Sequence, residues 1–211
     1  YALQDQYEAN HIVFRDFHGI NEDLDNLMAD NGFFRITMPD TNVVSEMTWN
    51  TADDFYHSLS PNSRNQLRKK VLRHEQQFNV EITEGNVSQK IIDYWYRLYL
   101  NVKEKSFDLN TFALPRKFFK VISGHKDWEV IQLHLKDIYI EGTPCCIVFC
   151  YKTRDAYIPM IIGMDYTFNS KFGIYRQALY QVVIRAKELV KKRILLRFSA
   201  DIEKQKLEAK P

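Results

Sequence analysis

Three consecutive strand patterns at residues 129–164 constrain the fold of this chain more than any other feature. Apolar and polar residues alternate at 129–136, and two apolar runs follow at 145–151 and 157–164. Alternation with a period of two is typical of strands that bury one face, and the charged segment 152–155 is typical of a turn between strands. These patterns predict an antiparallel meander of three strands.

Helical patterns surround this meander. The segments with apolar residues at helical spacing are 88–105, 115–123 and 174–190. Strand patterns occur at 80–83 and 193–198, and a last helix is expected to begin near Asp201. This order predicts an α/β fold with a mixed, mostly antiparallel sheet flanked by helices. A hydrophobic content of 45% is sufficient for a packed core.

The first part of the chain is predicted to form an N-terminal α/β subdomain at residues 1–79, followed by the core domain at 80–211. Within this subdomain, short strands are expected at 12–17 and 33–38, on either side of a helix at 21–29.

Two helix starts are predicted near the end of the N-terminal subdomain. Thr51 and Asp54 have the spacing of a capping box, and Ser60 stands directly before Pro61, a good first helical residue. The second of these helices carries five basic residues, Arg64, Arg68, Lys69, Lys70 and Arg73. Such a face is most often a solvated surface, and the alternative is contact with phosphates of a donor or acceptor.

The charge balance and the apolar pattern exclude several classes of protein. Lys and Arg number 29 against 27 Asp and Glu, so the net charge of +2 does not fit a protein that packages nucleic acid. No apolar run is long enough for a transmembrane helix or a signal peptide, which predicts a cytoplasmic protein without membrane insertion. The chain begins at Tyr1 rather than methionine, which suggests a piece of a longer polypeptide.

Cysteine and histidine usage predicts neither disulfides nor a metal site. Cys145, Cys146 and Cys150 all lie in one apolar run, where core packing is favoured over nucleophilic catalysis. The six histidines have no metal-ligand spacing, so no metal is expected. The sequence also lacks the glycine-rich motifs of dinucleotide and nucleotide-triphosphate sites and the elbow of serine hydrolases.

Three segments carry a resemblance to a known family. They are DYTFNSKFGIYR at 165–176, ILLRFSADIEK at 194–204, and the basic helix that Leu59 and Ser60 introduce. They resemble the GNAT acyltransferases, in the branch related to Fem-type peptidyltransferases and to GNAT domains fused to PLP-dependent oxoamine synthases. The resemblance implies direct transfer of an acyl group from a thioester to a primary amine.

The resemblance also implies a site. The strands at 157–164 and 193–198 would splay apart, and exposed backbone amides in the gap would hold the pantetheine arm of the donor. An N–H group near Gly163 or Met164 could then stabilise the tetrahedral oxyanion.

Candidate catalytic residues follow the strand at 157–164. Asp165 could accept a proton from the amine, and Tyr166 or Tyr175 could protonate the leaving thiolate. The alternative for these residues is turn formation and aromatic packing.

The last strand and helix supply a second group of candidates. Ser199, Asp201 and Lys204 resemble the closing motif of the family near the gap, with Ser199 counted as catalytic and the other two as donor-binding. The alternative for this group is a serine N-cap, an acid in the first helical turn and a surface lysine.

The phosphate-binding segment departs from the family pattern. The usual loop has two closely spaced glycines before its helix, whereas residues 168–174 contain only Gly173. Lys171 and Arg176 could bind phosphate through side-chain charge instead, together with the N-terminus of the following helix. No tightly bound cofactor is expected, and acyl-CoA or a related thioester is the expected co-substrate.

The sequence leaves several acceptors, donors and partner domains possible. A small-molecule amine is the expected acceptor, and the donor could also be an acyl carrier protein or an aminoacyl-tRNA. A further alternative is a catalytically silent domain that positions a partner, such as a PLP-dependent synthase on the same polypeptide.

Overall fold

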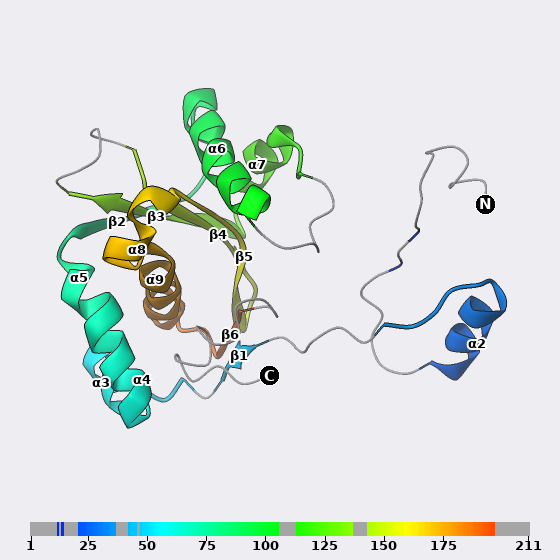
Figure 1. The fold of residues 1–211 in the computed structure, drawn as a ribbon, viewed down its shortest axis with the longest axis horizontal. Coiled ribbons are helices and arrows are strands. Elements are labelled where there is room, and N and C mark those ends of the chain that lie inside the picture. Colours follow the sequence, from blue (N-terminus) through cyan, green and yellow to red (C-terminus); the bar gives the residue numbers. More distant parts are fainter. Residues whose placement is uncertain are drawn as a thin grey trace. The chain divides into compact units, whose positions relative to one another are not determined.

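The computed structural model describes residues 12, 14, 21–36, 42–45, 47–105, 113–136 and 143–196. The chain divides into two compact units, residues 1–39 and residues 40–211 (Figure 1). The boundary predicted after residue 79 falls within β2 (Phe78–Thr83) of the second unit, and the division into a subdomain and a core stays a prediction.

The first unit contains helix α2 (Glu22–Asp30), which agrees with the helix predicted at 21–29. Asn21 caps it, since its side chain accepts a hydrogen bond of 3.1 Å from the N–H of Leu24. An ion pair of 2.7 Å joins Arg35 to Asp25. Residues 33–36 are not in a strand, and the remainder of the strands predicted at 12–17 and 33–38 lies largely outside the described residues.

The second unit is built on a six-stranded sheet with the order β1-β6-β5-β4-β3-β2. The strands are β1 (Val43–Val44), β2 (Phe78–Thr83), β3 (Trp128–Leu135), β4 (Cys146–Lys152), β5 (Ala156–Met164) and β6 (Arg193–Leu195). All neighbours are antiparallel except β5 and β6, which are parallel. The predicted meander is therefore confirmed as β3, β4 and β5, and the mixed, mostly antiparallel α/β class is confirmed with it.

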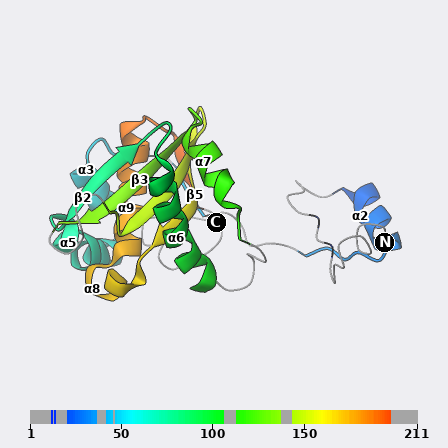
Figure 2. The same cartoon turned by 90° about the horizontal axis from the view of Figure 1, so that it is seen from above.

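Helices cover both faces of this sheet (Figures 1 and 2). Helices α6 (Gln89–Lys105) and α7 (Arg116–Ser123) lie on one face, and α9 (Ile174–Glu188) lies on the other. All three agree with predicted helices to within a few residues. No helix in the described parts of the chain has the length and apolar character needed to cross a membrane.

Each face of the sheet has its own core. On the α6 side, Trp95 and Phe119 pack edge to face on Phe149, and all three are fully buried. The indole N–H of Trp95 donates to Oε1 of Gln132 on β3 over 2.9 Å, so the polar group buried there has a partner. On the α9 side, Ile131, Leu133 and Leu135 of β3 face the helix, as their alternation predicted.

A helical segment before β2 packs beside α9. Its parts are α3 (Ala52–Ser58), α4 (Pro61–Leu67), the π-helix η1 (Arg68–Leu72) and α5 (Arg73–Glu75). The predicted capping box of Thr51 and Asp54 is present, and Ser60 caps α4. The sequence did not predict the π-helical turn, which interrupts the basic helix where its cations are densest.

The cysteine prediction is confirmed as far as the structure tests it. Cys145, Cys146 and Cys150 are free and buried. Burial raises the pKa of the Cys145 thiol to about 12, which keeps it protonated at neutral pH. A protonated, buried thiol suits core packing and is a poor nucleophile.

Candidate functional site

The sheet opens between β5 and β6. In the described part of the chain, the two strands pair through Ala156 with Arg193 and Tyr157 with Ile194. Beyond these pairs β5 continues to Met164, whereas the N–H of Leu196 donates to the carbonyl of Asn42, next to β1. Within the described residues, β5 therefore extends beyond its pairing with β6, as the predicted splay requires.

A β-bulge interrupts β5 midway along this edge. Pro159 lies opposite Cys150 and Ile161 lies opposite Phe149, so Met160 is the extra residue. Because side chains alternate along a strand, one extra residue moves the following residues to the other face. Tyr157 consequently faces α9, whereas Ile161 packs with the core below α6.

The register decides which amide of β5 faces the gap. Asp165 donates its N–H to the carbonyl of Cys145 over 2.8 Å. Hydrogen-bonded and non-hydrogen-bonded residue pairs alternate along an antiparallel ladder. The Asp165 bond therefore makes Met164 and Cys146 a non-hydrogen-bonded pair, and Gly163 and Ile147 a hydrogen-bonded pair. The N–H of Gly163 thus belongs to the ladder, and the N–H of Met164 is directed to the β6 side.

Gly163 has a packing role instead. A Cβ atom at this position would lie 2.6 Å from the backbone N of Tyr99 and 2.7 Å from the carbonyl carbon of Leu98. The missing side chain lets α6 pack directly on β5. The last turns of α6 then reach the end of the strand, where Asn101 Nδ2 donates to the carbonyl of Met164 over 3.2 Å.

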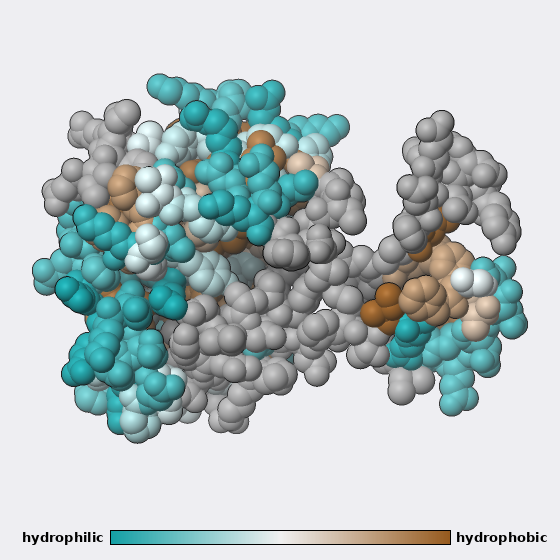
Figure 3. Space-filling view, in the orientation of Figure 1, coloured by the Kyte–Doolittle hydropathy of each residue, from teal (hydrophilic) through white to brown (hydrophobic). Residues whose placement is uncertain are grey.

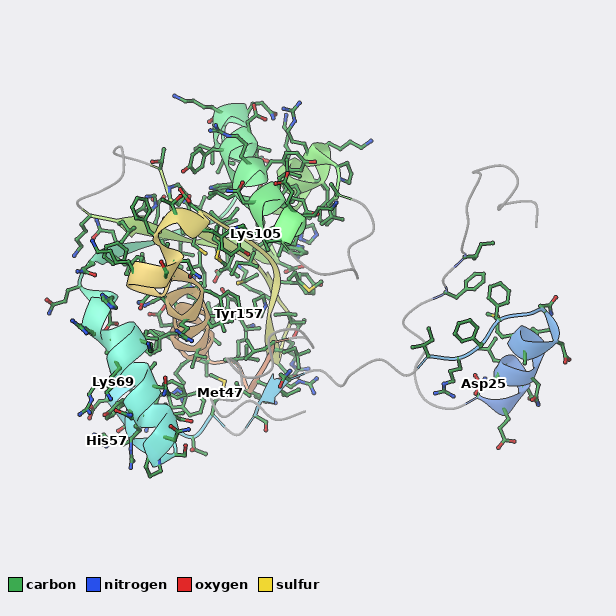
Figure 4. All side chains as sticks on the ribbon, in the orientation of Figure 1. Asp25, Met47, His57, Lys69, Lys105 and Tyr157 are labelled. Atoms are coloured by element: carbon green, nitrogen blue, oxygen red, sulfur yellow. The ribbon has the colours of Figure 1, made fainter. Side chains whose placement is uncertain are left out.

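Asp165 and Tyr166 lie at the end of β5. The carboxylate of Asp165 accepts the N–H of Thr167 over 2.8 Å and so caps the short 3-10 helix η2 (Tyr166–Phe168). Tyr166 is partly buried, and burial raises the pKa of its phenol. Nζ of Lys105, from the end of α6, lies 4.1 Å from the centre of the Tyr166 ring (Figure 4).

Tyr175 is in the first turn of α9. Its N–H donates to Oδ1 of Asn169 over 3.0 Å, and its ring packs against the same core cluster as Tyr166. One of the amides at the N-terminus of α9 is therefore already used by a side chain.

The segment expected to hold phosphate is not an open loop. The 3-10 helix η2 is followed directly by a helical turn, α8 (Asn169–Phe172), and Gly173 ends this turn with φ +63 and ψ +41. A left-handed conformation of this kind favours glycine. A Cβ atom at Gly173 would also lie 2.7 Å from the carbonyl oxygen of Lys70.

This contact joins two groups of candidates that the sequence kept apart. Lys70 belongs to η1, and Lys171 lies two residues before Gly173 on α8. The basic helix and the segment that carries Lys171 are therefore in direct contact. No local pattern in the sequence indicates this proximity.

Of the remaining candidate residues, the structure describes Arg176 but not the three near the C-terminus. Arg176 lies in the first turns of α9 and is partly buried. Ser199, Asp201 and Lys204 lie outside the described residues. Among the residues that the structure describes, no three His, Cys, Asp or Glu side chains come together in a way that could hold a metal ion.

Solved structures with similar folds were found at low identity. L-PGS from Bacillus licheniformis shares 12% identity with a TM-score of 0.55, over 85% of this chain and 51% of that one. The C-terminal domain (DUF2156) of a protein from Agrobacterium fabrum assigned to lysylphosphatidylglycerol synthetases shares 12% identity with a TM-score of 0.51, over 89% and 56%. The ribosomal-protein-S18-alanine N-acetyltransferase of Escherichia coli shares 16% identity with a TM-score of 0.41, over 62% and 75%. The chain thus spans about half the length of the first of these proteins.

Comparison of the sequence with curated proteins gives no match. Residues 61–194 match the family Acetyltransf_6, described as an acetyltransferase (GNAT) domain. This range contains α4, the whole meander and α9, and it covers more than half of the chain. The chain therefore belongs to the GNAT acetyltransferase family.

Proposed function

We propose that this domain transfers an acyl group from a thioester donor to a primary amine by direct attack. The observation that supports the proposal is the edge of β5, which continues to Met164 whereas its described pairing with β6 ends at Tyr157. An extended donor arm can pair with such an edge through main-chain hydrogen bonds, as an added strand does.

The proposed chemistry uses the end of this edge. The amine nitrogen attacks the thioester carbonyl, and the developing oxyanion accepts a hydrogen bond from the N–H of Met164. Collapse of the intermediate forms the C–N bond and breaks the C–S bond. The proton lost from the amine passes to Asp165 or to a water that it orders, and Tyr166 protonates the leaving thiolate.

The environment of Tyr166 supports its role as the acid. Because burial raises the pKa of the phenol, the group stays protonated until the thiolate forms. Asp165 directly precedes Tyr166, and both residues follow the last residue of β5.

The helical turns between β5 and α9 affect which kind of donor the domain can bind. CoA, a carrier protein and a tRNA can all present an activated carbonyl to the same edge. A segment that consists of helical turns, with the Tyr175 amide bonded to Asn169, favours donors that are held by side-chain charges. A cytoplasmic location would fit all three donors.

The test is an acyl-transfer assay with mass-spectrometric detection of the N-acyl product. Acetyl-CoA, a long-chain acyl-CoA and acyl-pantetheine serve as donors, with a panel of primary amines as acceptors. We expect transfer from at least one donor and its loss in Asp165→Asn. No product with any donor would instead support a silent domain that positions a partner, such as a PLP-dependent synthase on a longer chain.

A further inference from the structure

One face of α6 carries polar side chains to the end of β5. Residues three or four positions apart on a helix lie on the same face. Four side chains of α6 have this spacing, and they are Tyr94, Arg97, Asn101 and Lys105. We call this group the α6 polar face.

The path of α6 across the sheet directs its last turns to the end of β5. The indole of Trp95 bonds to Gln132 on β3, and the backbone of Tyr99 lies where a side chain at Gly163 would stand. Gln132, Ile147 and Gly163 form one row across β3, β4 and β5. The helix therefore crosses the strands from β3 towards β5 (Figure 2), and its C-terminal turns follow after this crossing.

The first half of the α6 polar face lies beside Asp165. The hydroxyl of Tyr94 donates to the carbonyl of Pro144 over 3.1 Å, directly before β4. Burial raises the pKa of the Tyr94 phenol, and the nearby charge of Asp165 raises it further. The guanidinium carbon of Arg97 lies 5.1 Å from the centre of the Tyr94 ring. Arg97 is therefore held close to the carboxylate that the proposed mechanism uses as the base.

The second half of the α6 polar face contacts the proposed reaction centre. Nδ2 of Asn101 donates to the carbonyl of Met164, the residue whose N–H is proposed to bind the oxyanion. One turn later, Nζ of Lys105 lies 4.1 Å from the centre of the Tyr166 ring (Figure 4 labels Lys105). An amine that attacks a carbonyl at Met164 therefore lies within reach of this face.

The two cations of the α6 polar face have no anionic partner. Arg97 and Lys105 are exposed, and within the described part of the chain neither has a carboxylate at ion-pair distance. Their contacts are with aromatic rings, which leave the N–H groups able to donate hydrogen bonds. The space-filling view shows mainly hydrophilic side chains around α6 (Figure 3). Two positive charges thus flank the Asn101 amide.

We propose that Arg97 and Lys105 bind an acidic group, a carboxylate or a phosphate, on the acceptor amine. This inference rests on the proposed function and names the chemical class of its acceptor. The guanidinium fork fits either anion, and the ammonium group adds a point charge. The two residues determine specificity, because the bonds that form and break lie at Met164.

The helix geometry fixes where this acidic group binds. Eight residues separate Arg97 from Lys105, which puts about 12 Å between their backbones along the axis. An anion that engages both side chains therefore lies between them, over Asn101. The second N–H of the Asn101 amide can donate to it there.

The α6 polar face suits a small anion better than a polyanion. Proteins that bind nucleic acid tightly often make about 6 to 10 phosphate contacts. Two cations on one helix supply far fewer. One acidic group beside a reacting amine requires only one or two charge-assisted hydrogen bonds.

The test compares acceptors of equal chain length, using the donor that the transfer assay identifies. The acceptors are ω-amino acids, aminoalkyl phosphates and the neutral amides of the amino acids. We expect kcat/KM for one acidic acceptor to exceed that of the neutral amide about tenfold or more. Whether the carboxylate or the phosphate series shows the larger ratio identifies the acidic group.

In the variant Arg97→Gln/Lys105→Gln, the ratio of acidic to neutral kcat/KM should fall towards one, mainly through the KM of the acidic acceptor. The ratio is the decisive readout, because losing the contact of Lys105 with Tyr166 would slow all acceptors alike. The charge-conserving variant Arg97→Lys/Lys105→Arg should retain most of the ratio. A wild-type ratio near one would overturn the inference, as would a ratio that survives Arg97→Gln/Lys105→Gln.

The matched control is Lys117→Gln/Lys120→Gln. It removes two exposed cations from α7, which neighbours α6 on the same face of the sheet. This control should leave the ratio unchanged. An equal fall in the ratio for both double variants would mean that net charge alone attracts acidic acceptors, and would overturn the inference.

A binding measurement separates this inference from the proposed function. Calorimetric titration with an ω-amino acid and with its amide requires no transfer. Tighter binding of the acid that Arg97→Gln/Lys105→Gln abolishes, without product from any donor, would support the acidic-group site and refute the proposed transfer. Equal transfer to acidic and neutral amines would refute the site and leave the proposed function standing. Thermal melting of each variant checks that the fold is intact.

Discussion

Glu129 on β3 and Arg185 on α9 form a two-point ion pair across the interface between the sheet and the helix. Nε of Arg185 lies 2.9 Å from Oε1 of Glu129, and Nη2 lies 3.0 Å from Oε2. The hydroxyl of Tyr157, on β5, donates to Oε1 over 2.6 Å (Figure 4). The side chain of Glu129 is fully buried. The pair therefore anchors α9 to two strands of the sheet.

Removing the charge of Glu129 should destabilise the fold. Glu129→Gln removes the buried carboxylate from its pair with the partly buried Arg185, which is expected to cost about 3 kcal/mol. Urea unfolding measures this difference. Glu188→Gln is the control, because this exposed carboxylate also pairs with Arg185 and should cost about 0.5 kcal/mol. Equal losses in the two variants would contradict the assigned role of Glu129.

The same ion pair predicts how stability depends on pH. Burial alone would raise the pKa of Glu129, but the hydrogen bonds from Arg185 and Tyr157 and the charge of Arg185 lower it to about 2. A carboxyl whose pKa is lower in the folded state contributes stability above its unfolded pKa, for which the reference value is 4.5. This stability should be lost as the pH falls from about 5 towards 2. Unfolding free energies measured across this range should fall less steeply in Glu129→Gln than in the wild type.

Gly163→Ala should weaken the packing of α6 on β5. The new Cβ would meet the backbone of Leu98 and Tyr99, which cannot rotate away, so we expect a loss of about 1 to 3 kcal/mol. Gly124→Ala is the matched control, because the close contacts of its Cβ would be with the end of the Asn86 side chain, which can move. Chemical denaturation should show the larger loss for Gly163→Ala. The reverse order would contradict the packing role of Gly163.

Gly173→Ala should both strain the backbone and separate α8 from η1. A left-handed φ costs about 1 kcal/mol for alanine, and contact with the Lys70 carbonyl adds to this. Gly85→Ala shares a positive φ, +82, and has no atom within 4 Å of its Cβ, so it measures the backbone cost alone. Thermal melting should show a larger loss for Gly173→Ala. Losses of the same size would mean that the close approach to Lys70 is unimportant.

Tyr166→Phe should slow the proposed transfer with little change in stability. Loss of a general acid typically costs about 10²-fold or more in kcat. The effect should shrink with donors whose thiol leaves more easily, and this dependence separates an acid from a packing residue. Thr167→Ala is the control, because it keeps the N–H that Asp165 caps. A uniform change for all leaving groups would contradict the role of Tyr166.

Local chemistry explains what was predicted correctly. The alternation in β3, the capping box of Thr51 and the proline at the start of α4 are features of neighbouring residues. The predicted class and the meander followed from such features. The two-residue strand β1 was missed because its length carries no period, and it exists through pairing with β6.

The candidate site was predictable only in part. Asp165 and Tyr166 are consecutive, so the sequence alone brings them together at the end of a predicted strand. The oxyanion N–H is predicted near Gly163 or Met164, and the sequence does not distinguish between the two. The structure shows that α6 packs against Gly163 where a side chain would stand, and that the register turns the N–H of Met164 to the gap.

The sequence by itself determined the elements, because periodicity, caps and turns act between residues a few positions apart. Tertiary structure decided the bulge at Met160, the opening between β5 and β6, and the contact of Gly173 with the Lys70 carbonyl. These features depend on strand register and on the packing of distant helices. A register shift of one residue reverses the face of every side chain that follows, and no local pattern in β5 specifies where that shift occurs.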